Sequence, residues 1–291
     1  MLVQTLPLTT SVTLTAAPLT RAAFAPFGEV LSNPAPETRP SNTEPYVVTS
    51  TLPFGAELAN QGTAIKYAAI ASLRNLYNSN DGRVQAPSGR PAEARMTMFV
   101  CGARMPLPSS SSSSSQQHQQ DDTAGAAGGV EVKILERHPF TTQTFIPLTA
   151  DASKRYLVIV APSLLPSALD EGLPVPGEDK AGSSSSTTSL SPSSNLPGRG
   201  MPDLAKVRAF IATGDQAVTY GAGTWHAPMV ALGPSKSTVD FLVFQFANDT
   251  ALEDCQEVAL ESKGSADATE KPKILVRLDT AAAAKSLTSK L

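Results

Sequence analysis

The chain has 291 residues, a formal net charge of −3, 41% hydrophobic residues and 17% charged residues. This composition excludes a wholly disordered chain, which would combine high net charge with few apolar residues, and it offers no basic surface for nucleic acid. No apolar run approaches the roughly 20 residues that span a bilayer, and because the first 20 residues are uncharged, we expect neither a membrane protein nor a secretory signal.

The first segment with helical character is LTRAAFAPF at 19–27, where Thr20 could cap a helix that Pro26 cuts short. After it the sequence predicts short strands, rich in β-branched and aromatic residues. In chain order these predicted strands are 63–70, 96–102, 130–136, 143–148, 156–161, 206–212, 216–221, 239–247 and 272–278. The run YLVIVA at 156–161 is almost continuously apolar, as expected of a strand that packs on both faces.

Two low-complexity stretches, 108–129 and 171–200, are rich in Ser, Gly, Gln and Pro. They cannot bury enough apolar surface to offset the entropy of ordering, so we expect disordered insertions within one domain. We place that domain at 19–260, after an N-terminal segment (1–18) and before a C-terminal strand and tail (261–291). Many short strands with Gly and Pro turns predict an all-β fold, as a sandwich, jelly roll or small barrel.

Two histidines fall outside the insertions, and each lies in a segment that resembles half of a cupin motif. Glu136-x-His138-x4-Gln143 resembles the first motif, with Glu in place of its first His and Gln in place of its Glu. GDQAVTYGAGTWHAPM (214–229), which contains His226, resembles the second motif. Alternation places Glu136 and His138 on one face of a strand, and we expect the strand of His226 to close the barrel opposite them.

Polar groups that converge inside a small barrel form its usual ligand site. Glu136, His138, Gln143 and His226 could therefore hold a divalent metal ion, although an amide is a poor ligand for most transition metals. The alternative is that the two histidines are buried and hydrogen-bond each other or a substrate.

Several blocks closely resemble the ureidoglycolate lyase family, in particular its fungal type. They are NQGTAIK (60–66), ERHPFTTQTFIPL (136–148), 202–233 and VDFLVF (239–244), and LTRAAFAPFGEVL (19–31) resembles the opening segment of the family. The resemblance covers most of residues 19–255 and is interrupted by the two insertions.

The resemblance implies a cupin-like double-stranded β-helix, or jelly-roll barrel, that forms a homodimer and acts in allantoin breakdown. The family splits (S)-ureidoglycolate into glyoxylate and urea. One carbon of this substrate carries a hydroxyl, a carboxylate and the ureido nitrogen, so its collapse needs a base for the hydroxyl proton and an acid for the departing nitrogen. Histidine suits both tasks near neutral pH, and a cation should hold the carboxylate.

We expect His138 or His226 to be the base, and the other histidine or Glu136 to be the acid. Lys66 is assigned to the substrate carboxylate, because a lysine that points inward from its strand needs an anion beside it. Strand alternation equally allows Lys66 to point outward into solvent.

The remaining substrate-binding assignments are less constrained by the sequence. Gln143 and Asn60 could hydrogen-bond the ureido group, and Tyr220 could orient the hydroxyl. Arg208 is either a second clamp for the carboxylate or a partner in a surface ion pair.

Three other function classes compete with the lyase. An amidohydrolase acting on the same substrate would release ammonia, but the sequence offers no carboxylate-rich dinuclear metal site. A metal-dependent cupin oxygenase or isomerase is disfavoured by the replacement of two usual ligands with Glu136 and Gln143. A non-catalytic cupin that binds a small ligand is the third alternative.

The sequence ends in Ser289-Lys290-Leu291, the tripeptide that the peroxisomal import receptor reads. The preceding residues are small and polar, which leaves the tripeptide accessible. We therefore expect a peroxisomal protein, with the cytosol as the alternative.

Overall fold

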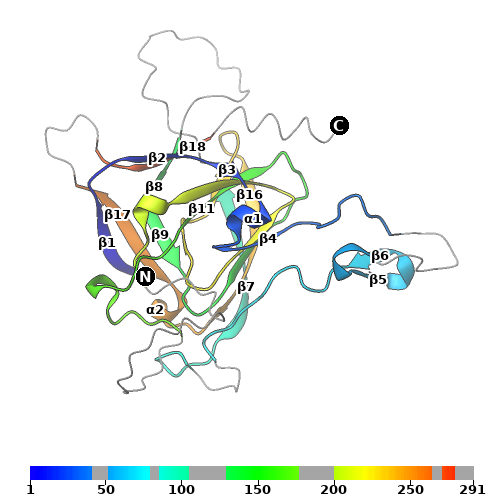
Figure 1. The fold of residues 1–291 in the computed structure, drawn as a ribbon, viewed down its shortest axis with the longest axis horizontal. Helices are drawn as coiled ribbons and strands as arrows, with labels where there is room; N and C mark the ends of the chain where they lie inside the picture. Colours follow the sequence, from blue (N-terminus) through cyan, green and yellow to red (C-terminus); the bar gives the residue numbers. More distant parts are fainter. Residues whose placement is uncertain (41–51, 79–84, 105–128, 177–199, 264–270, 279–291) are drawn as a thin grey trace, which may run out of the picture.

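The computed structural model describes residues 1–40, 52–78, 85–104, 129–176, 200–263 and 271–278, and strands predominate in these ranges (Figure 1). The α-helices found there are α1 (Arg21–Phe24) and α2 (Ala251–Asp254). Thr20 caps α1 as predicted, because its side-chain oxygen accepts a hydrogen bond from the backbone N–H of Ala23. The predicted all-β, cupin-like fold with few short helices is confirmed. Most of the two insertions lies outside the described residues.

The strands form two large sheets, one smaller sheet and a separate hairpin. The largest sheet has the order β1 (Leu2–Leu8), β17 (Gln256–Ser262), β9 (Ile134–Arg137), β14 (Trp225–His226), β11 (Arg155–Ala161), β12 (Arg208–Thr213) and β3 (Ala17–Pro18), with β15 (Val230–Leu232) also paired to β11. The five-stranded sheet has the order β4 (Gly28–Leu31), β13 (Ala217–Tyr220), β10 (Gln143–Pro147), β16 (Thr238–Ala247) and β7 (Glu93–Gly102).

The smaller sheet has the order β2 (Val12–Thr15), β18 (Ile274–Arg277) and β8 (Gly129–Val132), and the hairpin pairs β5 (Glu57–Ala59) with β6 (Ala64–Lys66). Short 3-10 helices lie at Pro53–Gly55, Asn60–Gly62, Ala168–Asp170 and Leu204–Lys206. The predicted strand at 130–136 is divided into β8 and β9. Of the predicted strand at 63–70, only Ala64–Lys66 forms, as β6.

Strand β11 lies within the largest sheet and is buried on both faces, which explains its apolar run. Leu157 and Ile159 of β11 belong to one core, shared with the apolar side chains of β8 and β18. Tyr156, Val158 and Val160 alternate with them and belong to a second core, shared with the five-stranded sheet. Aromatic rings dominate this second core: Tyr156 and Phe241, for example, meet edge to face with ring centroids 5.0 Å apart.

Residues 1–18 contribute three strands to these sheets. β1 pairs in parallel with β17, β2 pairs in parallel with β18, and β3 pairs in parallel with β12. The sequence analysis did not predict these strands. Gln4, Thr5 and Pro7 interrupt the apolar alternation of β1, β3 has only two residues, and β2 is a short alternating VTLT segment. The pairing ties the beginning of the chain to its C-terminal part.

The β5–β6 hairpin stands apart from the sheets, at the right of Figure 1. Its backbone pairs Glu57 with Lys66 and Ala59 with Ala64. Asn60 and Gln61, at its turn, both have a positive φ, which non-glycine residues seldom adopt. A two-stranded hairpin by itself is marginally stable in water, so we expect this element to contribute little to the stability of the fold.

Candidate active site

The strand that carries His226 lies directly beside the strand that carries Glu136. β14 pairs antiparallel with β9, and His226 is the register partner of Glu136. The expectation that the strand of His226 closes the barrel opposite was therefore wrong: the two strands are neighbours in one sheet. Cross-strand partners point to the same face, so both side chains face the five-stranded sheet.

His138 follows β9 and is buried among these groups. Its Nδ1 lies 2.6 Å from the backbone carbonyl oxygen of Asp254, which can only accept, so Nδ1 carries the proton. Its Nε2 is buried and has no hydrogen-bond partner in the described part of the chain. Burial, together with the nearby His226, lowers the pKa of His138 to about 4. The ring is therefore neutral at pH 7, with a lone pair on Nε2.

The second imidazole, that of His226, faces acceptors at both nitrogens. Nδ1 lies 2.9 Å from the carbonyl oxygen of Thr224, and Nε2 lies 3.1 Å from Oε1 of Gln143 and 3.5 Å from Oε1 of Glu136. The ring of Tyr220 stacks on the imidazole with centroids 4.0 Å apart. Because acceptors surround it, this ring is arranged to carry a proton on Nε2.

Glu136 supplies the negative charge of the site. Burial opposes its ionisation, but the hydrogen bond and the charge of His226 outweigh burial and lower the pKa of Glu136. Glu136 is therefore a carboxylate at neutral pH. Tyr220 behaves in the opposite way, because complete burial raises its pKa well above the usual range and keeps the phenol neutral.

The opposite face of β9 and β14 holds the two strands in place. The guanidinium of Arg137 lies 4.5 Å from the ring centroid of Trp225, and both side chains are buried. Arg137 Nη1 and Trp225 Nε1 both donate to the carbonyl oxygen of Gly200. Trp225 thus packs beneath the segment that carries His226.

A tight turn sets the position of His226. The N–H of Gly223 donates to the carbonyl of His138 at 2.8 Å, and the N–H of Thr224 donates to the carbonyl of Gly221. Gly223 has φ of 78°, a conformation that side chains disfavour. The turn thus links the backbones of the two histidine segments.

The same groups fit a divalent metal ion. One ligand atom from each of Glu136, His138 and His226 lies within 4.8 Å of the others. Each histidine directs Nδ1 at a backbone carbonyl, the outer contact that metal-ligating histidines usually make. Glu136, His138 and His226 could therefore bind a metal through the two Nε2 atoms and a carboxylate oxygen, and Gln143 could add its amide oxygen.

Three predicted substrate residues lie away from this cluster. Lys66 is in the β5–β6 hairpin, with its side chain 61% exposed and its ammonium 3.7 Å from Glu57. Asn60 lies at the exposed turn of the same hairpin. Arg208 is exposed at the start of β12, with its guanidinium 5.5 Å from the ring centroid of Phe210.

The side chains of Gln245 and Arg95, which the sequence analysis missed, extend the cluster. Nε2 of Gln143 donates to Oε1 of Gln245 at 2.7 Å, and Gln245 is the register partner of Arg95. One signal was available, because Gln245 is the single polar residue within FLVFQF. The contact between Asp254 and His138 is made by a backbone carbonyl, and no sequence pattern marks it.

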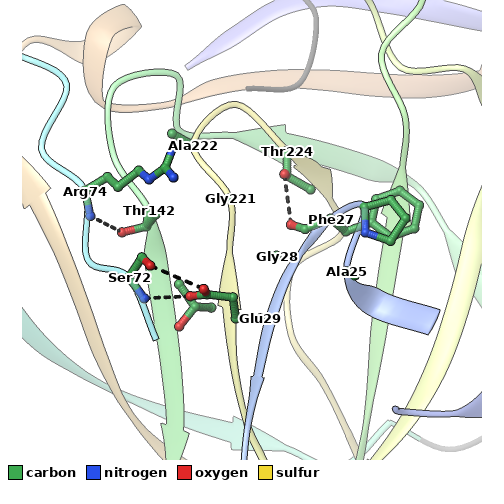
Figure 2. Close-up of a pocket in the computed structure, with 12 residues that line it drawn as sticks. Ala25, Phe27, Gly28, Glu29, Ser72, Arg74, Thr142, Gly221, Ala222 and Thr224 are labelled. Carbon is green, nitrogen blue, oxygen red and sulfur yellow. Dashed lines mark hydrogen bonds between the residues drawn. The ribbon is translucent and has the colours of Figure 1, made fainter. Parts of the chain in front are cut away.

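A separate pocket of about 140 Å³ lies behind the turn that positions His226. Figure 2 shows the guanidinium of Arg74 directed toward Ala222, and Ser72 hydrogen-bonded to Glu29. None of the predicted site residues lines this pocket. Thr219 does, and it alternates with Tyr220 along β13, so the pocket and the histidines lie on opposite faces of the sheet.

The fold and this site together define a small-molecule enzyme of the cupin-like class, with two buried imidazoles and a carboxylate between its sheets. Comparison with known proteins identifies the family. The family model "Ureidoglycolate lyase" matches residues 11–267, and the chain belongs to the ureidoglycolate lyase family.

Curated relatives agree with this membership. The chain is 31% identical over 255 residues to a ureidoglycolate lyase of Schizosaccharomyces pombe, covering 84% of this chain and 90% of the relative. It is 30% identical to one of Saccharomyces cerevisiae, covering 84% and 93%, and 28% identical to one of Burkholderia mallei, covering 81% and 84%. The predicted resemblance to the fungal type is confirmed.

Proposed function

We propose that this protein splits (S)-ureidoglycolate into glyoxylate and urea, a step of allantoin and purine breakdown. Family membership supports the substrate. The observation that carries the chemistry is the pair of adjacent imidazoles in different hydrogen-bonding environments: Nε2 of His138 has no partner among the described residues, whereas both ring nitrogens of His226 face acceptors.

His138 is the base in this proposal. Its Nε2 is unprotonated at neutral pH, because Nδ1 donates to the carbonyl of Asp254 and burial holds the pKa near 4. The substrate hydroxyl would give this buried nitrogen the hydrogen-bond partner that it otherwise lacks.

His226 is the acid. Its Nδ1 donates to Thr224, and its Nε2 is directed at Gln143 and the carboxylate of Glu136. The ring centroids of the two histidines lie 5.6 Å apart. An acid and a base this close suit a substrate whose hydroxyl and departing nitrogen are bonded to the same carbon.

The two histidines account for every proton transfer in the cleavage of ureidoglycolate. His138 takes the hydroxyl proton, the carbon–oxygen bond becomes the aldehyde of glyoxylate, and the carbon–nitrogen bond breaks. The electrons of that bond pass to the ureido nitrogen, which takes a proton from His226 and leaves as urea. Return of a proton from His138 to His226 restores the starting state, and Glu136 stabilises the charged form of His226.

Gln143 and Tyr220 lie beside the reacting groups, and we assign them to orienting the substrate. Lys66, Asn60 and Arg208 stay predicted substrate residues, since no contact in the described residues tests them. A divalent ion held by Glu136, His138, Gln143 and His226 would occupy both Nε2 atoms. It is therefore the alternative to acid–base chemistry by the two histidines, and it would polarise the substrate hydroxyl as a Lewis acid.

One assay tests the function and its rivals. Purified protein is incubated with ureidoglycolate, and urea and ammonia are measured against spontaneous breakdown, with and without a chelator. Urea formation above the spontaneous rate supports the lyase, and ammonia would identify the amidohydrolase. Absence of both products would favour a non-catalytic or oxidative cupin, and loss of urea formation with the chelator would establish a metal requirement.

We further propose a homodimer that uses the outer face of β7 and β16. Met96, Met98 and Val100 point to this face and are 61–64% exposed, and Met98 pairs with Leu242 of β16. Apolar side chains clustered on an open sheet face favour association. Met98→Asp should convert the dimer to a monomer in light scattering, and an unchanged dimer would place the interface elsewhere.

The peroxisomal location is also a proposal, and it rests on Ser289, Lys290 and Leu291, which lie outside the described residues. We expect a fluorescent protein fused ahead of the chain to colocalise with a peroxisomal marker. Removal of the three residues should give diffuse cytosolic fluorescence, and a diffuse signal from the intact fusion would contradict the proposal. As for membranes, no helix among the described residues is long and apolar enough to cross one.

A further inference from the structure

A row of polar side chains runs from the histidines to an arginine at the edge of the five-stranded sheet. Glu136 and His226 lie at one end, and Gln143 and Gln245 continue the row through hydrogen bonds of 3.1 and 2.7 Å. Arg95 stands at the other end as the register partner of Gln245. Cross-strand partners share a face, so Arg95 points to the same side of its sheet as Gln143.

The guanidinium of Arg95 is held by an ion pair, but one of its N–H donors has no hydrogen-bond partner among the described residues. Its Nη2 lies 2.8 Å from Oδ2 of Asp249. Its Nε is buried and has no hydrogen-bond partner in the described residues. A buried N–H without a partner is costly, and an ion pair with an exposed carboxylate contributes little stability. This guanidinium therefore has a donor available for a ligand.

The space in front of Arg95 is open to solvent. Thr97 and Phe99 follow Arg95 at alternate positions of β7, on the same face, and both are exposed. The ring of Phe99 contacts that of Phe145, whose side chain belongs to the core between the two sheets. Phe99 therefore lies where the exposed edge of β7 meets the core between the two sheets.

The charges along the row favour an anionic group on the Arg95 side of the reacting carbon. Glu136 makes the histidine end negative, whereas Arg95 supplies a positive charge at the other end, where Asp249 and Glu93 lie 2.8 and 3.8 Å from its Nη2 and offset part of that charge. Two strand spacings separate Arg95 from Gln143, about 10 Å between Cα atoms, and the long arginine side chain can cover part of this distance. An anionic group is thus favoured near Arg95 and disfavoured beside Glu136.

We propose that Arg95 binds the carboxylate of the substrate, through its Nε and an adjacent Nη, in the two-point geometry that arginine forms with carboxylates. This inference rests on the proposed function. It assigns to Arg95 the role for which the sequence favoured Lys66. Asp249 then acts as a positioning residue that orients the guanidinium.

The test compares Arg95→Ala with Lys66→Ala in the urea-release assay. For Arg95→Ala we expect KM for ureidoglycolate to rise roughly 10- to 100-fold, the usual cost of losing a hydrogen-bonded charge, while kcat changes less than KM. The rise in KM should be larger for Arg95→Ala than for Lys66→Ala. Arg90→Ala is the matched control, because Arg90 donates to the backbone of the same Asp249, and it should leave KM nearly unchanged.

Product inhibition separates binding of the carboxylate from general damage. Glyoxylate carries the carboxylate and urea does not, so Arg95→Ala should weaken inhibition by glyoxylate and leave inhibition by urea unchanged. Added guanidinium should partly restore glyoxylate binding. If Arg95→Ala does not fold, Arg95→Lys serves instead, because it keeps the charge and loses the two-point geometry.

Three results would overturn the inference: an unchanged KM in Arg95→Ala, a rise in KM for Lys66→Ala alone, or equal weakening of glyoxylate and urea. Failure of the proposed function is recognised separately, as the absence of urea from the wild-type protein. Calorimetric titration of wild type and Arg95→Ala with glyoxylate would then still decide whether Arg95 binds carboxylates.

Discussion

Two regions of this chain carry equally distinctive sequence, the histidine segments and the β5–β6 hairpin, yet the fold treats them very differently. His138 and His226 are buried and joined to the rest of the site by hydrogen bonds. Lys66, in the hairpin, is exposed and pairs with Glu57 of the same hairpin. A sequence block shared with the family therefore does not by itself place a residue at the reacting centre. Four experiments test this contrast between the histidine segments and the hairpin.

The largest effect is expected at His226. His226→Ala should lower kcat roughly 10³- to 10⁴-fold, because it removes the acid that protonates the departing nitrogen. The measurement is urea release at saturating ureidoglycolate, with circular dichroism to show an intact fold. His118→Ala, at the remaining histidine, which lies in the insertion at 108–129, should keep wild-type activity. Near-normal turnover of His226→Ala would remove His226 from the mechanism.

His138→Gln should lower kcat roughly 10²- to 10³-fold, because glutamine can still hydrogen-bond the carbonyl of Asp254 but cannot accept the hydroxyl proton. A pH profile sharpens the assignment: the wild-type rate should fall as the pH is lowered toward 4, where His138 becomes protonated. The assignment of His138 as the base fails if His138→Gln keeps the wild-type rate.

The burial of His138 should also appear in the stability of the fold. The pKa of a histidine is 6.5 in the unfolded chain, whereas that of His138 is about 4 in the folded protein. Between these values the unfolded state binds more protons, so the free energy of unfolding decreases as the pH falls from 6.5 to 4. The shift corresponds to about 3 kcal/mol.

Guanidinium chloride denaturation at pH 7 and pH 4 measures this contribution. In His138→Gln the loss of stability on acidification should be smaller than in the wild type by about 2–3 kcal/mol. The same acid sensitivity in both would show that His138 is not buried in its neutral form.

The smallest effect is expected in the hairpin. Leu58 pairs with Ile65 there and is only half-buried, so Leu58→Ala should change the free energy of unfolding by less than about 1 kcal/mol. Leu135→Ala is the matched control on β9, where the side chain is fully buried, and it should cost about 2–5 kcal/mol. A comparable loss in Leu58→Ala would show that the hairpin packs against the folded protein.

Much of the fold could be read from local pattern. The apolar run of β11 predicted a strand buried on both faces, and the structure gives Leu157 and Tyr156 to different cores. Strand β1 could not be predicted in this way, because Gln4, Thr5 and Pro7 interrupt its alternation and parallel pairing with β17 holds it in place.

For the site, residue type and spacing in the sequence were enough to select Glu136, His138, Gln143 and His226, the four side chains that the structure brings together. Alternation along a strand fixed the face on which Glu136 and His138 lie. Only the tertiary structure decided that β14 lies beside β9 and that Gln245 and Arg95 extend the row. The physical reason is that strand alternation is local, whereas strand pairing and register depend on residues more than a hundred positions apart.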